Sequence, residues 1–243
     1  MDRLADSVAY RAATNRRLWL SRCATLCLTA ALLTSISGCQ IVIGVLQIFQ
    51  GFPKTKNDFA VKTRGKSLAE KGKKTIILVH ATPGAQAEEP SLDLNIMDEV
   101  SRRLKAENVT VVPSHKVARW LDDRGQIVLD TSIEPIARHF KADYVVLFSF
   151  EEFGYREDNS PSLFRGHTNG KIVVTEMVGD NDNGGKKHGK VIYNCPFTYK
   201  YPGNRPVSSD QEGPDVFKRK FLGQLSNFLT RRFVDYRPED EID

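Results

Sequence analysis

Three short stretches of the chain are almost entirely apolar, and more polar segments separate them. They cover residues 75–80, 109–112 and 143–150. An uninterrupted apolar run of this length is typical of a strand buried on both faces, whereas a half-exposed strand alternates apolar and polar residues. The pattern therefore predicts three interior strands.

Apolar residues between these runs recur at helical spacing. The spacing predicts a helix over 91–106, with Asn108 suited to its end. Its inner stripe is Ile96, Met97, Val100 and Leu104. Ser114 can cap a short helix that ends near Asp122, and Thr131 or Ser132 can cap another that runs to Phe140. We therefore expect helices to connect the strands.

The carboxyl-side half has a different pattern. Residues 154–162 are polar and are predicted to form a loop, and 163–178 and 188–201 are predicted to form two long strands joined by turn-forming residues 179–185. In the second strand the alternation places Val191, Tyr193, Cys195, Phe197, Tyr199 and Tyr201 on one buried face. Pro196 favours a sheet edge or a bulge.

A last amphipathic pattern predicts a closing helix over 215–234. Its inward residues are Phe217, Phe221, Leu225, Phe228 and Leu229. Strands separated by helices, then a hairpin and a closing helix, predict an α/β (α+β) fold in which helices pack on a mixed sheet. This domain covers residues 75–234, and the acidic tail 235–243 is expected to be loose.

Residues 1–38 have the three parts of a secretory signal: a basic start, an apolar core over 23–36, and the small residues Ser37 and Gly38. The sequence Ile36-Ser37-Gly38-Cys39 resembles the lipobox of bacterial lipoproteins. The resemblance implies that the signal is removed, that Cys39 receives acyl chains such as palmitate, and that the protein faces an extracytoplasmic space. Gln40 in place of an aspartate implies the outer rather than the inner membrane.

A single-pass signal anchor is the alternative. No charged residue occurs from Cys23 to Phe52, and an uncut helix there is long enough to cross a bilayer. Ser37 and Gly38 interrupt this run, and basic residues flank both of its ends, so the charge bias gives little orientation. We therefore favour the lipoprotein signal.

Residues 39–74 join the modified cysteine to the domain. The polar or glycine positions of 40–52 fall on one helical stripe, which predicts a helix in the membrane interface or one docked on the domain. Residues 54–74 contain eight basic residues and only two acidic ones, Asp58 and Glu70. This stretch is either attracted to anionic lipid headgroups or a solvated linker.

Charge and cysteine content exclude several classes of function. The net charge is +5, and the five arginines and two aspartates before Cys39 contribute +3 of it, so no nucleic-acid-binding face is expected. Loss of the signal removes Cys23 and Cys27, and acylation uses Cys39. Cys195 then has no disulfide partner, and we expect it to be an inert core residue. No metal ligands and no cofactor are predicted.

Four stretches together resemble a known family. They are the lipobox, Ile76–His80, Ile136–Val146 and Leu163–Gly166. They resemble envelope lipoproteins of the curli-secretion and penicillin-binding-protein-activator type, whose fold is also like the amino-terminal domain of the Tol–Pal translocation protein. The resemblance covers residues 75–234. It implies a non-enzymatic envelope domain that binds another protein or forms oligomers.

One arrangement could support catalysis instead. His80 ends the first predicted strand, and Glu151 and Glu152 follow the third. Ligand sites in open α/β sheets gather beyond the carboxyl ends of strands, so a His–Glu acid/base pair would give a hydrolase. Polar residues are ordinary at sheet edges, and we assign no catalytic residue.

The sequence therefore predicts a membrane-anchored envelope lipoprotein with Cys39 as its lipidation site. Its partners would be membrane lipid, through the acyl anchor, and an envelope protein or a second copy of the chain. The alternatives are a single-pass anchored protein with the same domain, and a hydrolase that uses His80 with Glu151 or Glu152.

Overall fold

The computed structural model describes residues 54–123, 133–157, 160–179 and 187–237. The chain divides into two units, Met1–Pro53 and Lys54–Asp243, and the second contains all of the described residues. The predictions for the signal, Cys39, the segment 40–52 and the turn 180–185 lie outside the described residues.

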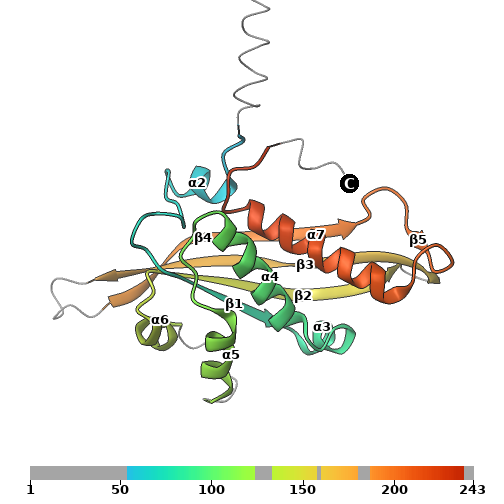
Figure 1. Cartoon of the computed structure of the whole chain (residues 1–243), viewed down its shortest axis with the longest axis horizontal. Coiled ribbons are helices and arrows are strands. Elements are labelled where there is room, and N and C mark those ends of the chain that lie inside the picture. The colour runs from blue at the N-terminus through green and yellow to red at the C-terminus, as the bar shows by residue number, and fades with distance from the viewer. Residues whose placement is uncertain (1–53, 124–132, 158–159, 180–186, 238–243) are drawn as a thin grey trace, which may run out of the picture. The chain divides into compact units, whose positions relative to one another are not determined.

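The domain is built on a mixed sheet in the order β1-β2-β3-β4, with β5 paired to β3. Its strands are β1 (Thr75–Ala81), β2 (Tyr144–Glu157), β3 (Ser160–Gly179), β4 (Lys187–Tyr201) and β5 (Val207–Ser208). β1 and β2 are parallel, and the other pairs are antiparallel. Helices pack on this sheet (Figure 1), which confirms the predicted α/β class.

The helices α4 (Leu92–Ala106) and α7 (Pro214–Arg231) cover one face of the sheet and lie side by side (Figure 1). The helices are α2 (Asp58–Lys62), α3 (Pro83–Glu88), α4 (Leu92–Ala106), α5 (Ser114–Asp122), α6 (Glu134–Phe140) and α7 (Pro214–Arg231). The predicted inner stripes of α4 and α7 are buried, except that Phe228 is partly exposed. Asn108 follows α4 with φ of 64°, the left-handed conformation predicted for that end.

The predicted strand over 109–112 is not a full strand. Val109, Val111 and Val112 are buried, but the segment makes only an isolated parallel bridge between Thr75 and Val111. Pro113 follows at once and occupies the N-cap position of α5. Ser114 does not cap this helix, because its hydroxyl donates to Asp98 instead, at 2.8 Å. The burial of the valines in this segment was predicted correctly, but their pairing as a full strand was not.

The predicted loop over 154–162 is wrong. β2 continues to Glu157 and β3 begins at Ser160. Bulges between Phe150 and Glu152 and between Gly154 and Arg156 break the alternation of β2, so its sequence does not look like a strand. The extension is held by rings that pack on α7. Phe153 lies 5.5 Å from Phe221, and Phe164 lies 5.2 Å from Phe217, between ring centroids.

A bulge between β3 and β4 also makes the predicted buried face of β4 wrong at Val191. Val174 pairs with Tyr193, but the next residue, Thr175, pairs with Val191. Because neighbouring residues of a strand point to opposite faces, Val191 is turned away from the face of Tyr193. Val191 is accordingly 58% exposed. Pro196 lies in a strand paired only with β3 in the described part of the chain, as an edge position requires.

The basic segment 54–74 belongs to the packed domain rather than to a solvated linker. Phe59 of α2 and Leu68 are completely buried. Thr55 pairs with Tyr236 in an antiparallel bridge, so residues just before the domain meet the residues just after α7. The start of the carboxyl-terminal tail is therefore ordered, and residues 238–243 lie outside the described part.

Candidate functional site

Cys39 lies outside the described residues, so its predicted lipidation stays a prediction. Among the residues that the structure describes, no helix is long and apolar enough to cross a membrane. The same part of the chain holds no group of three or more histidine, cysteine, aspartate or glutamate side chains able to hold a metal ion.

The structure does not assemble the catalytic pair considered from the sequence. His80 is exposed on β1, in register with Ser149 of β2. The bulge in β2 pairs Glu152 with Asn169 of β3, whose Nδ2 donates to the Glu152 carboxylate at 2.6 Å. Glu151 is exposed, and within the described residues no hydrogen bond joins His80 to either glutamate. The strand ends are close in the sheet, but the acid and the base are not brought together.

Asp93 of α4, rather than either glutamate, lies within the electrostatic influence of His80. Asp93 accepts a hydrogen bond from Gln86 at 3.2 Å. Burial raises the pKa of Asp93, and the Gln86 hydrogen bond and the charge of His80 only partly oppose this effect. The hydrogen bond from Gln86 to Asp93 links α3 to α4.

The buried thiol of Cys195 lies in a polar cluster that fastens α2 to β4. Lys62 Nζ lies 3.2 Å from Cys195 Sγ and 3.0 Å from Asp58 Oδ2. The Tyr193 hydroxyl donates to the same Asp58 oxygen at 2.5 Å. We call Asp58, Lys62, Tyr193 and Cys195 the α2 cluster. Sequence reasoning missed its partners, although Asp58 and Lys62 stand at the i, i+4 spacing of a helical ion pair.

The charges of the α2 cluster favour its folded arrangement. Burial raises the pKa of Asp58, but the hydrogen bond from Tyr193 and the ammonium of Lys62 outweigh it, so this pKa lies below its usual range. Burial and the neighbouring carboxylate raise the pKa of Tyr193. The Tyr193 phenol thus stays protonated and the Asp58 carboxylate stays ionised, so the hydrogen bond between them is kept. The α2 cluster therefore holds α2 against β4.

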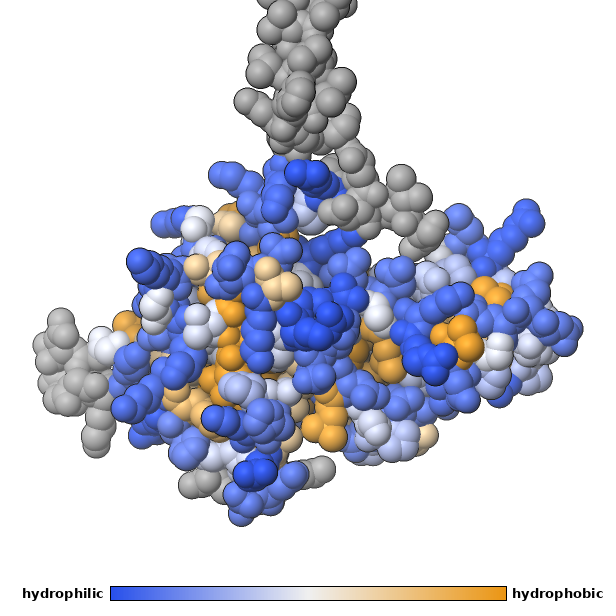
Figure 2. All heavy atoms as spheres, viewed as in Figure 1, coloured by the Kyte–Doolittle hydropathy of each residue, from blue (hydrophilic) through white to orange (hydrophobic). Residues whose placement is uncertain are grey.

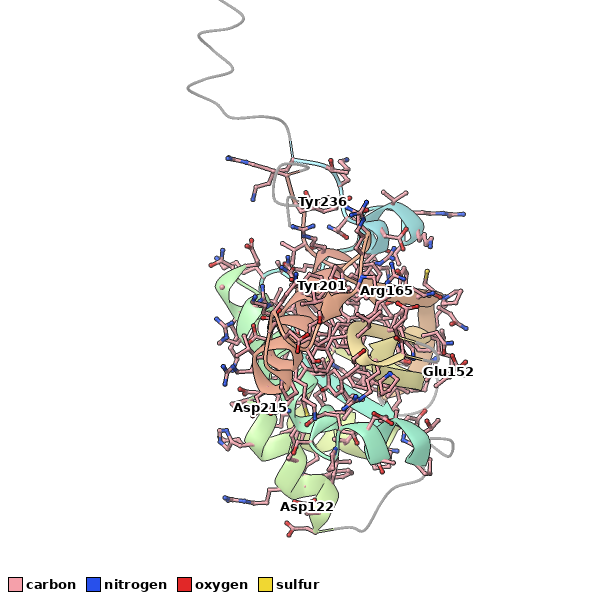
Figure 3. All side chains as sticks on the ribbon, turned by 90° about the vertical axis from the view of Figure 1, so that its right-hand side faces the viewer. Asp122, Glu152, Arg165, Tyr201, Asp215 and Tyr236 are labelled. Carbon is pink, nitrogen blue, oxygen red and sulfur yellow. The ribbon has the colours of Figure 1, made fainter. Side chains whose placement is uncertain are left out.

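A groove of about 240 Å³ opens on the outward side of β2, β3 and β4, near the end of the hairpin between β2 and β3. We call it the hairpin groove. Its lining residues are all of polar or charged types: Glu152, Arg156, Glu157, Arg165, His167, Thr168, Asn169, Thr198 and Lys200. Figure 3 looks onto this end of the molecule, where Glu152 and Arg165 are labelled.

The hairpin groove presents both fixed and available charges. Arg165 is held by Glu157 at 3.0 Å and by the carbonyl of Asn204 at 2.8 Å. Lys200 is exposed. Asn169 donates to Glu152, but its Oδ1 is buried and accepts no hydrogen bond from the described residues. A buried acceptor without a donor is costly.

The hairpin groove could not be found from the sequence. Arg165, His167 and Asn169 are outward positions of a strand, and such positions are polar in any half-exposed sheet. Only the bulged pairing of β2 with β3 brings Glu152 and Arg156 beside them. The alternation of polar and apolar residues along β3 is visible in the sequence, but the convergence of these polar side chains in one groove is not.

Comparison with known proteins yields similar structures only. No protein-family model matches the chain, and no curated protein matches it. The PelC dodecamer from Paraburkholderia phytofirmans is 14% identical, covers 76% of this chain and 96% of its own, and has a TM-score of 0.39. Lipoprotein GNA1162 from Neisseria meningitidis is 10% identical, covers 65% of this chain and 98% of its own, and has a TM-score of 0.39.

The LpoB C-terminal domain from Salmonella enterica is also similar in fold. It is 14% identical, covers 58% of this chain and 98% of its own, and has a TM-score of 0.30. Proteins named as lipoproteins stand among the similar structures. At these identities the likeness concerns the fold alone.

Proposed function

We propose that the chain is an envelope lipoprotein, anchored through acylated Cys39 to the outer membrane, whose domain binds another protein without catalysing a reaction. The observation that carries the proposal is the order of a basic start, an apolar core and Ser37-Gly38-Cys39 ahead of a folded domain that begins at Lys54. The His80 and glutamate arrangement offers no competing catalytic site, because no hydrogen bond joins these residues.

Substitution of the lipidated cysteine tests the anchor. We expect Cys39→Ala to leave an unprocessed precursor of lower gel mobility and to change its membrane fractionation. Cys27→Ala, within the signal core, serves as the control and should be processed normally. Mass spectrometry of the native amino terminus should find an acyl-glyceryl cysteine. An intact Met1 region would instead identify a signal anchor, and unaltered mobility and fractionation of Cys39→Ala would refute the lipoprotein.

The hairpin groove is our candidate for the protein-binding surface. It combines an exposed lysine, acidic groups and the unpaired Oδ1 of Asn169 in one concave place. An extended peptide segment offers the matching chemistry, because its acidic side chains can meet the exposed Lys200. The partner is therefore expected to dock a segment with acidic residues.

Photocrosslinking in intact cells tests this surface. A photoreactive residue at Thr198, inside the groove, should trap the partner. The same residue at Asn194 is the matched control, because Asn194 is also exposed on β4, four positions away, and does not line the groove. The mass of the product distinguishes a second copy of the chain from a different protein. Equal trapping at both positions, or none at Thr198, would remove the groove from the proposal.

A further inference from the structure

An amine and a thiol of the α2 cluster lie against each other on two different elements. Lys62 Nζ of α2 donates to Cys195 Sγ of β4 at 3.2 Å. The thiol in turn donates to the carbonyl of Pro196 at 3.4 Å. The sulfur of Cys195 therefore directs a lone pair, and not its hydrogen, toward the nitrogen of Lys62.

Two further contacts hold the Lys62 ammonium at this place. Asp58 Oδ2 lies 3.0 Å from Nζ, and the centroid of the Tyr193 ring lies 5.6 Å from it. The side chain of Lys62 is nevertheless 49% exposed, and Cys195 is 9% exposed. α2 lies at the surface of the domain (Figure 1), and Figure 2 shows largely hydrophilic side chains around it. A small oxidant dissolved in water can therefore reach the contact from the side of Lys62.

Cys195 has no second thiol with which to form a disulfide in the mature chain. The other cysteines are Cys23, Cys27 and Cys39, and the proposed processing and acylation take all three away. A thiol oxidised to a sulfenic acid condenses either with a thiol or with a nitrogen. The amine of Lys62 is such a nitrogen, already in contact with the sulfur.

We propose that Lys62 and Cys195 form an oxidation site, at which hydrogen peroxide joins them by a covalent nitrogen–sulfur bond. First, the sulfur takes an oxygen atom from the peroxide, whose O–O bond breaks, and water leaves. Then Nζ attacks the sulfur of this sulfenic acid, the S–O bond breaks, and the hydroxyl group leaves as water with a proton of the amine. One peroxide thus accepts the two electrons that the thiol and the amine lose. A second peroxide would insert an oxygen atom between nitrogen and sulfur and leave as water.

The cross-link fastens α2, which lies in the segment that enters the domain, to β4. It joins residues 133 positions apart in the chain, so it restricts the unfolded chain strongly. Oxidation should therefore raise the urea concentration at the midpoint of unfolding, and a thiol reductant should restore it. The inference goes beyond the lipid anchor and the hairpin groove, and it draws on the proposed processing only for the loss of the other thiols.

Tryptic peptide mapping of the full processed protein, with and without hydrogen peroxide, tests the inference. Trypsin cleaves after a free lysine but not after a cross-linked one. Peroxide should yield residues 57–64 joined to residues 191–200, about 2 Da lighter than the two peptides together, or about 14 Da heavier with the inserted oxygen. A thiol reductant should restore the separate peptides.

The amine of Lys62 attacks the sulfur only in its neutral form. Its hydrogen bonds to Asp58 and Cys195 raise its pKa. Tyr193 and Arg232 are the other ionisable groups at Asp58. Lys62 is therefore an ammonium at neutral pH, and the joined peptide should form at least about tenfold faster at pH about 9 than at pH about 7. A rate that does not rise with pH would contradict attack by the amine.

Matched arginine substitutions identify the lysine. Lys62→Arg keeps a cation beside the thiol, but a guanidinium is not deprotonated in proteins and cannot attack the sulfur. The joined peptide should then fall at least about tenfold, and Cys195 should gain about 32 or 48 Da as a sulfinic or sulfonic acid. Lys66→Arg makes the same exchange at a lysine that pairs with Glu176, and it should leave the cross-link unchanged.

The products themselves decide against the inference in three cases. It is wrong if peroxide carries Cys195 to a sulfinic or sulfonic acid while trypsin still cleaves after Lys62. It is also wrong if the joined peptide persists in Lys62→Arg, or if Cys195 is joined to another cysteine instead. The comparison of treated and untreated protein needs no variant, so it gives an answer even if a variant misfolds.

Discussion

At the scale of single residues, two glycines of β3 occupy places where no side chain fits. A Cβ atom at Gly170 would lie 2.0 Å from the carbonyl oxygen of Ser149, and one at Gly166 would lie 2.3 Å from the ring of Phe221. The first obstacle is backbone and the second a buried ring. These positions let β2 and α7 approach β3 closely, which the sequence alone did not indicate.

We expect Gly170→Ala to lower the free energy of unfolding by about 3 kcal/mol, because the paired backbone of β2 must move to admit the methyl group. Urea denaturation measures the loss. Gly203→Ala is the control, since nothing lies within 4 Å of its Cβ position, and it should change stability by less than about 0.5 kcal/mol. Equal effects at the two glycines would contradict the close approach.

Asp58 makes stability depend on pH in a definite direction. Its pKa is depressed in the folded state, so its contribution is present above the pKa of the unfolded chain and is lost as pH falls through the folded value. Asp58→Asn should cost about 1 kcal/mol at pH 7. The difference from the unmodified protein should begin to shrink as pH falls below about 4, where the aspartate of the unfolded chain takes up a proton, and should vanish once the folded carboxyl is protonated as well.

Urea denaturation at neutral and acid pH checks this prediction. Asp210→Asn, at an exposed position, should show no such convergence. A stability difference for Asp58→Asn that stays constant or grows on acidification would show that the carboxylate charge does not support the α2 cluster.

At the scale of elements, the structure confirms those hydrophobic patterns of the sequence that have an unbroken period. The stripes of α4 and α7 and the run of β1 were read correctly, since each buries one continuous surface. β2 beyond Phe150 and the start of β4 were misread, because bulges place an extra residue in one strand and reverse the faces that follow. Such a bulge depends on the partner strand, which the local sequence does not specify.

The short helix α2 offers a test that the segment 54–74 belongs to the domain. Phe59 is completely buried and its ring centroid lies 5.6 Å from those of Tyr193 and Phe233. Phe59→Ala should therefore cost about 3–5 kcal/mol in urea denaturation. Val61→Ala on the same helix, at a side chain that is 64% exposed, should cost less than about 0.5 kcal/mol. A mild effect of Phe59→Ala would restore the interpretation of a loose linker.

At the scale of the whole domain, its first and last described segments hold each other. Thr55 pairs with Tyr236, and Asn57, which caps α2, donates twice to Asp235. The chain therefore enters and leaves the domain at one place.

Loss of the Asp235 carboxylate should loosen this junction. We expect Asp235→Ala to lower the free energy of unfolding by about 2 kcal/mol, because it leaves two donors of Asn57 without their acceptor. Hydrogen exchange should accelerate over Asp58–Lys62. Asp210→Ala removes an exposed carboxylate elsewhere and should change neither quantity. Unchanged exchange in α2 after Asp235→Ala would show that the two segments do not depend on each other.

The sequence by itself determined the class of fold and the order of most helices and strands, because each depends on residues that are neighbours in the chain. The tertiary structure decided where the bulges fall, that Phe59 enters the core, and which polar residues converge in the hairpin groove. Those features depend on pairing between segments far apart in sequence, such as Thr55 with Tyr236 or Glu152 with Asn169. Local periodicity carries no information on such pairing.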